Sequence, residues 1–289
     1  MIDLSVSTTF ISDGEPLRKA LNQCEQAEIQ SVEIGSNHCF EENYNYLLDY
    51  PFQYLIHNYF PIPKDTFVLN IASLDENIRN RSILHINRAI DFCSKIGSSL
   101  YTFHPGFITD PKGSNISYQN YDFQWDENQI QNSNYDKAIY FMYNSLDEVV
   151  TYAKSQTIQV AIETEGSLKK KNHLLMQRPD EYEEFMAKYS SADIGINLNI
   201  GHLNLAANAF DFVRSEFVDL VQDYIVAMEL SHNDGLEDQH YPLDEKGWYW
   251  PLILDSRLEN AFKILEFRNT KIERIREVME LFVRKLSDV

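Results

Sequence analysis

The sequence contains little glycine, few cysteines and a small share of basic residues. Only 10 of its 289 residues are glycine, and 25 lysines and arginines face 44 aspartates and glutamates, which gives a net charge of −19. Because contacts to phosphate backbones need lysine and arginine, this charge argues against nucleic acid as a partner. The three cysteines, Cys24, Cys39 and Cys93, show no C-x-x-C spacing, which argues against a disulfide framework and a cysteine zinc site.

Long apolar runs are also missing. No stretch approaches the ~18 apolar residues of a membrane span, and the N-terminus lacks the features of a signal peptide. Hydrophobic residues make up 44% of the chain, which is enough for one large core. No linker rich in proline, glycine or serine interrupts the sequence. We therefore expect a cytoplasmic protein without membrane contact, in which residues 1–289 form a single domain.

Short apolar runs alternate with segments of helical periodicity. Eight runs are typical of buried parallel strands: Ile2–Val6, Ser31–Gly35, Gln53–His57, Ser99–His104, Ile158–Glu163, Asp193–Asn199, Ile225–Ser231 and Phe262–Glu266. Between them, Ser73 to Glu76 has the form of a capping box, Gly97 suits a helix end and Pro179 a first turn. Eight strand–helix units predict an α/β fold, the (β/α)8 TIM barrel. A doubly wound open sheet is the alternative, although no G-x-G-x-x-G or P-loop follows the first strand.

Histidines and carboxylates gather at the ends of these strands, where such barrels carry their chemistry. Seven of the eight histidines lie on or just after a strand end: His38, His57, His104, His173, His202, His232 and His240. Any one of them alone is explained as a hydrogen-bonded polar residue. A ring of imidazoles and carboxylates at one barrel mouth, however, suits a divalent transition metal.

Three motifs follow consecutive strands. His104-Pro105-Gly106 follows the fourth run, Glu163-x-x-Gly166 the fifth and Asn199-x-x-His202 the sixth. In this order the motifs resemble the xylose-isomerase-like barrel superfamily. That group includes endonuclease IV, ketose 3-epimerases and many homologues of sugar-phosphate isomerases and epimerases. The resemblance covers nearly the whole chain.

The resemblance implies a divalent metal ion, Mn, Co, Zn or Mg, at the barrel mouth. The epimerases hold one metal by a glutamate, an aspartate, a histidine and a glutamate from strands five to eight. Glu163 and Glu266 match the glutamates, whereas Asn199 stands at the aspartate position. On strand seven His232 is the obvious histidine, yet the family spacing puts Glu229 at that position. In endonuclease IV further ligands surround a three-zinc cluster, and the matching positions here are His57, His104, His202, Asp238 and His240.

The expected activity is that of a sugar isomerase or epimerase, acting on a sugar, a sugar phosphate or a nucleotide-linked sugar. Glu163 and Glu266 would remove and return a proton next to a carbonyl that the metal polarises, and His202 would move protons between oxygens. The alternative for the two glutamates is a salt bridge that holds the mouth. Because Asn199 lacks a negative charge, metal affinity should fall unless Glu229 restores it.

Substrate contacts are predicted for His57, His104, Lys170 and Trp248. Lys170 belongs to a run of three lysines that suits a phosphate, a carboxylate or a nucleotide, or else a solvated loop. The long segment after His104 and the aromatic residues Trp248 to Trp250 suit a lid and a sugar-stacking surface. They equally suit packing against a second copy, which leaves a homo-oligomer open.

Two other functions stay open. A metal-dependent phosphodiesterase resembling endonuclease IV is favoured by His57, His104, Asp238 and His240, and is opposed by the charge of −19. A metal-free binding or scaffold barrel is favoured by Asn199 at a ligand position.

Overall fold

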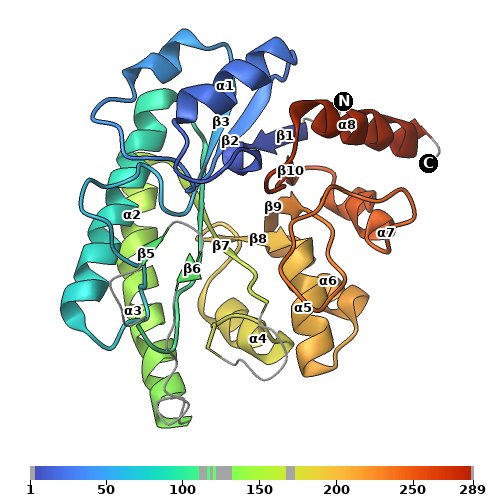
Figure 1. Cartoon of the computed structure of the whole chain (residues 1–289). Helices are drawn as coiled ribbons and strands as arrows, with labels where there is room; N and C mark the ends of the chain where they lie inside the picture. Colours follow the sequence, from blue (N-terminus) through green and yellow to red (C-terminus); the bar gives the residue numbers. More distant parts are fainter. Residues whose placement is uncertain (1–3, 111–115, 118–119, 122–131, 167–172, 288–289) are drawn as a thin grey trace.

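The computed structural model describes residues 4–110, 116–117, 120–121, 132–166 and 173–287. Eight parallel strands close into a barrel in the order β1, β10, β9, β8, β7, β4, β3, β2 (Figure 1). These strands are β1 (Leu4–Ser7), β2 (Ser31–Ile34), β3 (Gln53–His57), β4 (Leu100–Phe103), β7 (Gln159–Glu163), β8 (Gly195–Asn199), β9 (Ile225–Leu230) and β10 (Phe262–Leu265). The predicted (β/α)8 TIM barrel is confirmed, and the closed sheet excludes the doubly wound alternative.

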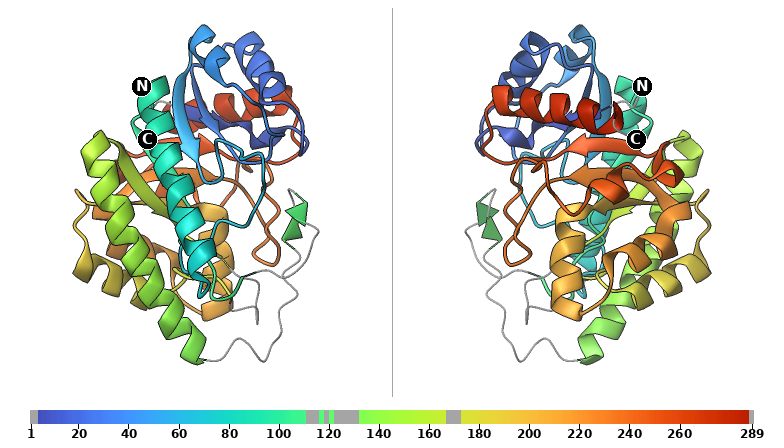
Figure 2. Two further views of the ribbon diagram at one scale, coloured as in Figure 1. Left: turned by 90° about the vertical axis from the view of Figure 1, so that its left-hand side faces the viewer. Right: turned by 90° about the vertical axis from the view of Figure 1, so that its right-hand side faces the viewer.

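Helices surround the barrel (Figures 1 and 2). They are α1 (Leu17–Gln26), α2 (Glu76–Ile96), α3 (Asn132–Gln156), α4 (Pro179–Lys188), α5 (Ile200–Phe210), α6 (Arg214–Val221), α7 (Trp250–Ile253) and α8 (Ile272–Ser287). Short 3-10 turns cover Thr8–Phe10, Asn45–Asp49, Gln222–Tyr224 and Ser256–Leu258, and an antiparallel hairpin joins β5 (Ile116–Ser117) to β6 (Asn120–Tyr121). Across the described ranges, no helix has both the length and the apolar character needed to cross a membrane.

The helix signals in the sequence act largely as expected. Pro179 opens α4, and Gly97 ends α2 in a left-handed conformation with φ of 76°. The predicted capping box at Ser73 is wrong. The N-cap of α2 is Asp75, whose carboxylate accepts a hydrogen bond from the Asn77 amide at 2.8 Å, while the Ser73 hydroxyl donates to Asp110 at 2.6 Å. A carboxylate next to the first helical residue satisfies the free N–H groups directly.

The barrel interior changes from apolar to polar along the strands. Its lower layer is apolar and contains Leu55, Leu100, Ala161, Ala227 and Ile264. Because side chains alternate across a strand, the residue two positions further along also points inward. Those positions carry polar side chains: His57, Thr102, Glu163, Glu229 and Glu266. On each of these strands, one inward-facing residue thus belongs to the hydrophobic layer, and the next inward-facing residue, two positions later, places a polar group at the mouth.

Candidate metal centre

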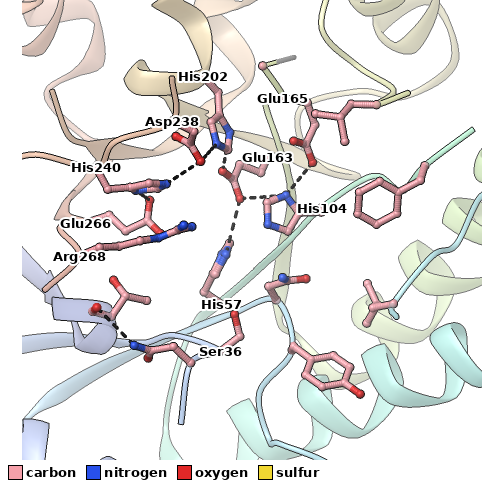
Figure 3. Close-up of a pocket in the computed structure, with 18 of the residues that line it drawn as sticks. Ser36, His57, His104, Glu163, Glu165, His202, Asp238, His240, Glu266 and Arg268 are labelled. Carbon is pink, nitrogen blue, oxygen red and sulfur yellow. Dashed lines mark hydrogen bonds and ion pairs between the residues drawn. The ribbon is translucent and has the colours of Figure 1, made fainter. Parts of the chain in front are cut away.

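A cavity of about 300 Å³ opens at the carboxyl ends of the strands (Figure 3). Histidines and carboxylates from β3, β7, α5 and the loops after β4, β7, β9 and β10 line it: His57, His104, Glu163, Glu165, His202, Asp238, His240 and Glu266. The predicted gathering of these side chains at one mouth therefore describes the observed geometry. Two separate groups of histidine and carboxylate can be distinguished within it.

The first group consists of His57, His104 and Glu163. Glu163 Oε2 lies 3.4 Å from His104 Nδ1 and 3.6 Å from His57 Nε2 (Figure 3). Two further residues orient the rings: His57 Nδ1 is hydrogen-bonded to the Thr102 hydroxyl at 2.9 Å, and His104 Nδ1 to Glu165 Oε1 at 2.6 Å. His57 is thus held through the ring nitrogen not directed at Glu163, as ligating histidines generally are, whereas His104 Nδ1 faces both Glu163 and Glu165.

The second group consists of His202, Asp238 and His240. Asp238 Oδ2 lies between the two rings, 3.6 Å from His202 Nε2 and 3.0 Å from His240 Nε2. The second ring nitrogens face other partners, because His202 Nδ1 contacts Glu163 Oε1 at 3.0 Å and His240 Nδ1 contacts Glu266 Oε2 at 3.1 Å. Glu163 therefore joins the two groups, with one oxygen directed toward each.

Charge and burial set the protonation of these histidines. Burial lowers the pKa of His57 to about 4, so its ring is neutral. Burial would also lower the pKa of His104, but Glu163 and Glu165 outweigh it and raise this pKa to about 9. In the same way Asp238 and Glu266 raise the pKa of His240 to about 9 against the effect of burial. The carboxylates are thus balanced here by protons, which a cation would replace.

The two groups have the composition and the spacing that a divalent cation requires. In each group one candidate ligand atom per residue lies within 4.8 Å of the others. Glu163 Oε2 is buried and makes no hydrogen bond, although it faces the rings of His57 and His104. Imidazole with carboxylate is a ligand set typical of zinc and of other divalent transition metals. The residues present therefore fit one cation in each group.

A third set of ligand types lies deeper in the barrel and consists of Glu33, His57 and Glu229. Both Glu33 oxygens are buried without a hydrogen-bond partner. Burial, reinforced by Glu266, raises the pKa of Glu33 well above its ordinary value, and burial with Glu163 does the same for the pKa of Glu229. These two carboxyl groups are therefore protonated under conditions in which ordinary glutamates are charged.

Asn199 does not belong to either histidine group. Its side-chain nitrogen donates toward Glu163 Oε1 at 3.0 Å and Glu229 Oε2 at 2.9 Å, and it lies 3.3 Å from Glu266 Oε2. Its side-chain oxygen accepts hydrogen bonds from the backbone amides of Gly201 and His202 at the start of α5. The predicted ligand position is thus occupied by an amide that is hydrogen-bonded on both sides.

Of the two strand-seven candidates, Glu229 is the one whose side chain meets the polar groups inside the barrel, where it accepts hydrogen bonds from Asn197 and Asn199. Glu229 points into the barrel, whereas His232 pairs its backbone with Tyr241 at 2.8 and 2.9 Å and has its ring centre 5.9 Å from that of Tyr249. His232 contributes to neither histidine group and does not line the cavity. The backbone bridge between His232 and Tyr241 turns the His232 side chain away from the mouth.

Of the other two residues predicted to contact substrate, one lies away from the cavity and one is outside the described residues. Trp248 does not line the cavity but packs under the Arg214 guanidinium, whose carbon is 4.3 Å from the ring centre. Lys170 lies outside the described residues, as do parts of the long segment after His104. From that segment Phe107 does line the cavity.

Three residues of the site were not assigned a role from the sequence: Glu33, Glu165 and Arg268. Glu33 could have been found, because it is the single charged residue in an otherwise uncharged predicted strand. Arg268 lies two residues after Glu266, and its guanidinium extends toward the centre of the cavity (Figure 3). The cavity is also lined by five carboxylates: Asp13, Glu163, Glu165, Asp238 and Glu266. Of these, Asp13 and Glu266 interact electrostatically with Arg268.

Known proteins with this architecture share the fold over nearly their whole length. Residues 25–284 match the family described as the xylose isomerase-like TIM barrel. The protein MJ1311 of Methanocaldococcus jannaschii is 22% identical over 288 residues, which are 95% of this chain and 88% of the relative. A solved D-tagatose 3-epimerase-like protein superposes with a TM-score of 0.76 at 20% identity, covering 100% of this chain and 98% of the other. Endonuclease IV from Thermus thermophilus superposes with a TM-score of 0.63 at 12% identity, covering 99% of this chain and 100% of the other.

At these identities the solved structures support the fold alone, whereas the family match spans most of the sequence. The closed barrel, the strand-end ligands and the extent of this match agree with one another. The chain belongs to the xylose isomerase-like TIM barrel family.

Proposed function

We propose that the protein is a metal-dependent hydrolase that cleaves a phosphoester bond in a small molecule. The observation that carries this proposal is the pair of histidine groups on one cavity, joined through Glu163. Two divalent cations held by these groups would polarise a phosphoryl oxygen of the substrate and would activate water at neutral pH. Each group supplies three candidate ligands, and both groups line the same cavity.

The chain's own residues have distinct roles in this proposal. Glu163 fixes the position of the two histidine groups relative to each other, since its two oxygens contact His104 and His202 at 3.4 and 3.0 Å. Glu165 fixes the orientation of the His104 ring. Arg268 supplies a guanidinium for one anionic oxygen of the substrate, because this fork matches phosphate geometry. The cavity of about 300 Å³ and the net charge of −19 favour a small substrate over duplex DNA.

The phosphoesterase proposal is tested with protein stripped by EDTA and reloaded separately with Zn²⁺, Mn²⁺ or Co²⁺. Hydrolysis of bis(p-nitrophenyl) phosphate should depend on the metal. Glu163→Gln should lower kcat/KM at least about 100-fold because it removes the shared carboxylate. Glu183→Gln, a substitution at an exposed position of α4, should have no effect. Metal-independent turnover, or equal activity in both variants, would overturn the proposal. Cleavage of abasic-site DNA in place of the small ester would redirect it toward the endonuclease branch.

A sugar isomerase or epimerase is the second candidate. It is supported by Glu163 and Glu266, two carboxylates that line the cavity and approach the same Asn199 nitrogen at 3.0 and 3.3 Å. In an epimerase, one carboxylate of such a pair removes a proton from one face of a carbon and the other returns a proton to the opposite face. It ranks second because the carbonyl-polarising metal was expected among Glu163, Asn199, Glu229 and Glu266, where the amide now donates its hydrogen bonds. Substrate-dependent exchange of a carbon-bound proton with D₂O, followed by NMR over a panel of ketoses and their phosphates, would reverse this ranking.

A metal-free binding barrel is the third candidate and is distinguished by metal content. Purified protein that contains no divalent ion, and that shows no thermal shift with Mn²⁺, Co²⁺ or Zn²⁺, would favour it over both enzymes. A shift with any of these ions would favour an enzyme.

A further inference from the structure

The carboxyl ends of β7, β8, β9 and the segment after β10 meet at one point in the barrel. Three carboxylates converge there, from Glu163, Glu229 and Glu266, and all three residues are buried. Three carboxyl groups in one buried place need a cation or protons to compensate their charge, and Glu229, whose pKa burial raises well above its ordinary value, keeps a proton as an uncharged acid. The group found between them is the side-chain nitrogen of Asn199, within 3.3 Å of an oxygen from each.

The orientation of this amide is set by the backbone. Asn199 is the N-cap of α5, and its oxygen accepts hydrogen bonds from Gly201 N at 3.0 Å and His202 N at 3.1 Å. An oxygen turned toward the carboxylates would leave both amides without an acceptor and would bring like partial charges together. The nitrogen must therefore face the carboxylates, and its two hydrogens serve three acceptors.

A second amide completes the arrangement. Asn197, two residues earlier on β8, donates to the other oxygen of Glu229 at 2.7 Å. Both Glu229 oxygens thus accept hydrogen bonds from amide donors, and Oε1 also lies 3.3 Å from His57 Nδ1. A cation placed among the three carboxylates would have to displace the Asn199 nitrogen and with it the N-cap of α5.

We propose that the Asn199 amide is a built-in substitute for a cation, and that it closes the space among Glu163, Glu229 and Glu266 to metal ions. Cations are then confined to the two histidine groups, which remain separate instead of merging into one cluster. This inference deepens the proposed function and rests on it only in taking the histidine groups as cation sites. It predicts that Asn199→Asp creates a further cation site, since the new carboxylate keeps the N-cap acceptor and turns its second oxygen toward the other three.

The test counts ions in full-length protein. Wild type, Asn199→Asp and the matched control Asn204→Asp are stripped with EDTA, reloaded with Zn²⁺ or Mn²⁺, dialysed and measured by metal analysis and calorimetric titration. Asn204 is also a buried asparagine of α5, but it bonds to Asn233 and Arg214, away from the three carboxylates. We expect one additional ion per chain in Asn199→Asp and no additional ion in Asn204→Asp.

Charge repulsion could unfold Asn199→Asp in the absence of metal, so a second variant is included. Asn199→Asp/Glu229→Gln keeps the number of carboxyl groups at this place at three and should also bind the additional ion. Circular dichroism establishes that each variant is folded. Folded variants that bind no more ions than wild type, or a wild type that already binds an ion beyond one per histidine group, would overturn the inference.

The number of ions bound per chain also distinguishes a failure of the role of Asn199 from a failure of the proposed function. A wild type without ions and an Asn199→Asp variant with one would support the role of Asn199 and contradict the metal-dependent hydrolase. A wild type with one ion in each histidine group but no phosphoesterase activity would leave the role of Asn199 intact and refute the proposed reaction.

Discussion

Gly166 packs against the first turn of α5, and its replacement by alanine should disturb one histidine group without touching a ligand. A Cβ at this position would lie 2.4 Å from the backbone oxygen of His202, 2.7 Å from its Cα and 2.9 Å from its carbonyl carbon. Ordinary contacts between carbon atoms are about 3.5–4.0 Å, so the two segments must separate by about 1 Å. All three atoms belong to the backbone, and no side-chain rotation can relieve the overlap.

The displacement carries His202 with it. Overpacking of this kind costs about 1–3 kcal/mol, which for a domain of this size lowers Tm by about 2–12 °C. His202 Nδ1 is tied to Thr164 O at 2.9 Å and to Glu163 Oε1 at 3.0 Å, so both contacts must lengthen. Because ligand geometry tolerates only a few tenths of an ångström, the His202 group should lose at least about 10-fold in metal affinity. The His57 group should keep its affinity.

Gly97→Ala is the matched control. Gly97 ends α2 with φ of 76° and has nothing within 4 Å of its virtual Cβ, so alanine there is penalised only by backbone strain of about 1–2 kcal/mol. Urea unfolding should therefore show both variants destabilised, while calorimetric titration with Zn²⁺ should show altered metal binding in Gly166→Ala alone. Unchanged stability and metal binding in Gly166→Ala, or the same metal defect in both variants, would refute the reasoning.

Two further predictions concern buried ionisable side chains that have no role in the proposed chemistry. In EDTA, Glu33→Gln should gain stability relative to wild type as the pH rises above about 5, by up to about 1.4 kcal/mol per pH unit. Folded Glu33 keeps its proton because burial raises its pKa, whereas the unfolded chain loses it, so wild type loses stability over this range; parallel urea-unfolding profiles against pH would contradict this. Lys263→Met should destabilise the fold by about 1–3 kcal/mol, because the Leu258 and Ala261 carbonyls lose the Lys263 Nζ donor at 2.6 and 2.9 Å. Burial lowers the pKa of Lys263 to about 8, so wild type gains stability as this group deprotonates and the deficit of the variant should grow above that pH; a deficit that shrinks would disprove the assignment.

The fold could be predicted because its signals are local. Most barrel strands are short, near-continuous apolar runs, and most runs are followed by a segment of helical periodicity. The ends of the strands and the starts of the helices with a clear signal were predicted within a few residues. The error at Ser73 arose because two nearby side chains, Ser73 and Asp75, could both cap α2. The choice between two capping residues depends on the path of the preceding loop, which no local pattern specifies.

The site was predictable in composition and less so in arrangement. Since every strand of a parallel barrel ends at the same mouth, residues such as His57 and Glu163 had to meet there. The position of a residue beyond a strand end depends on loop geometry instead. His232 lies two residues past β9 and was the more obvious ligand, yet a backbone bridge to Tyr241 turns it away.

The sequence by itself determined the barrel, the gathering of imidazoles and carboxylates at its mouth, and the loss of a charge at Asn199. Strand periodicity and the common direction of parallel strands suffice for the first two conclusions, and the third rests on the family resemblance. Only the tertiary structure decided that the ligands divide into two histidine groups, that Glu229 and not His232 enters the barrel, and that the Asn199 amide lies among three carboxylates. Those outcomes depend on distances between atoms of β7, β8, β9 and the segment after β10, which are far apart in the sequence and meet only when the barrel closes.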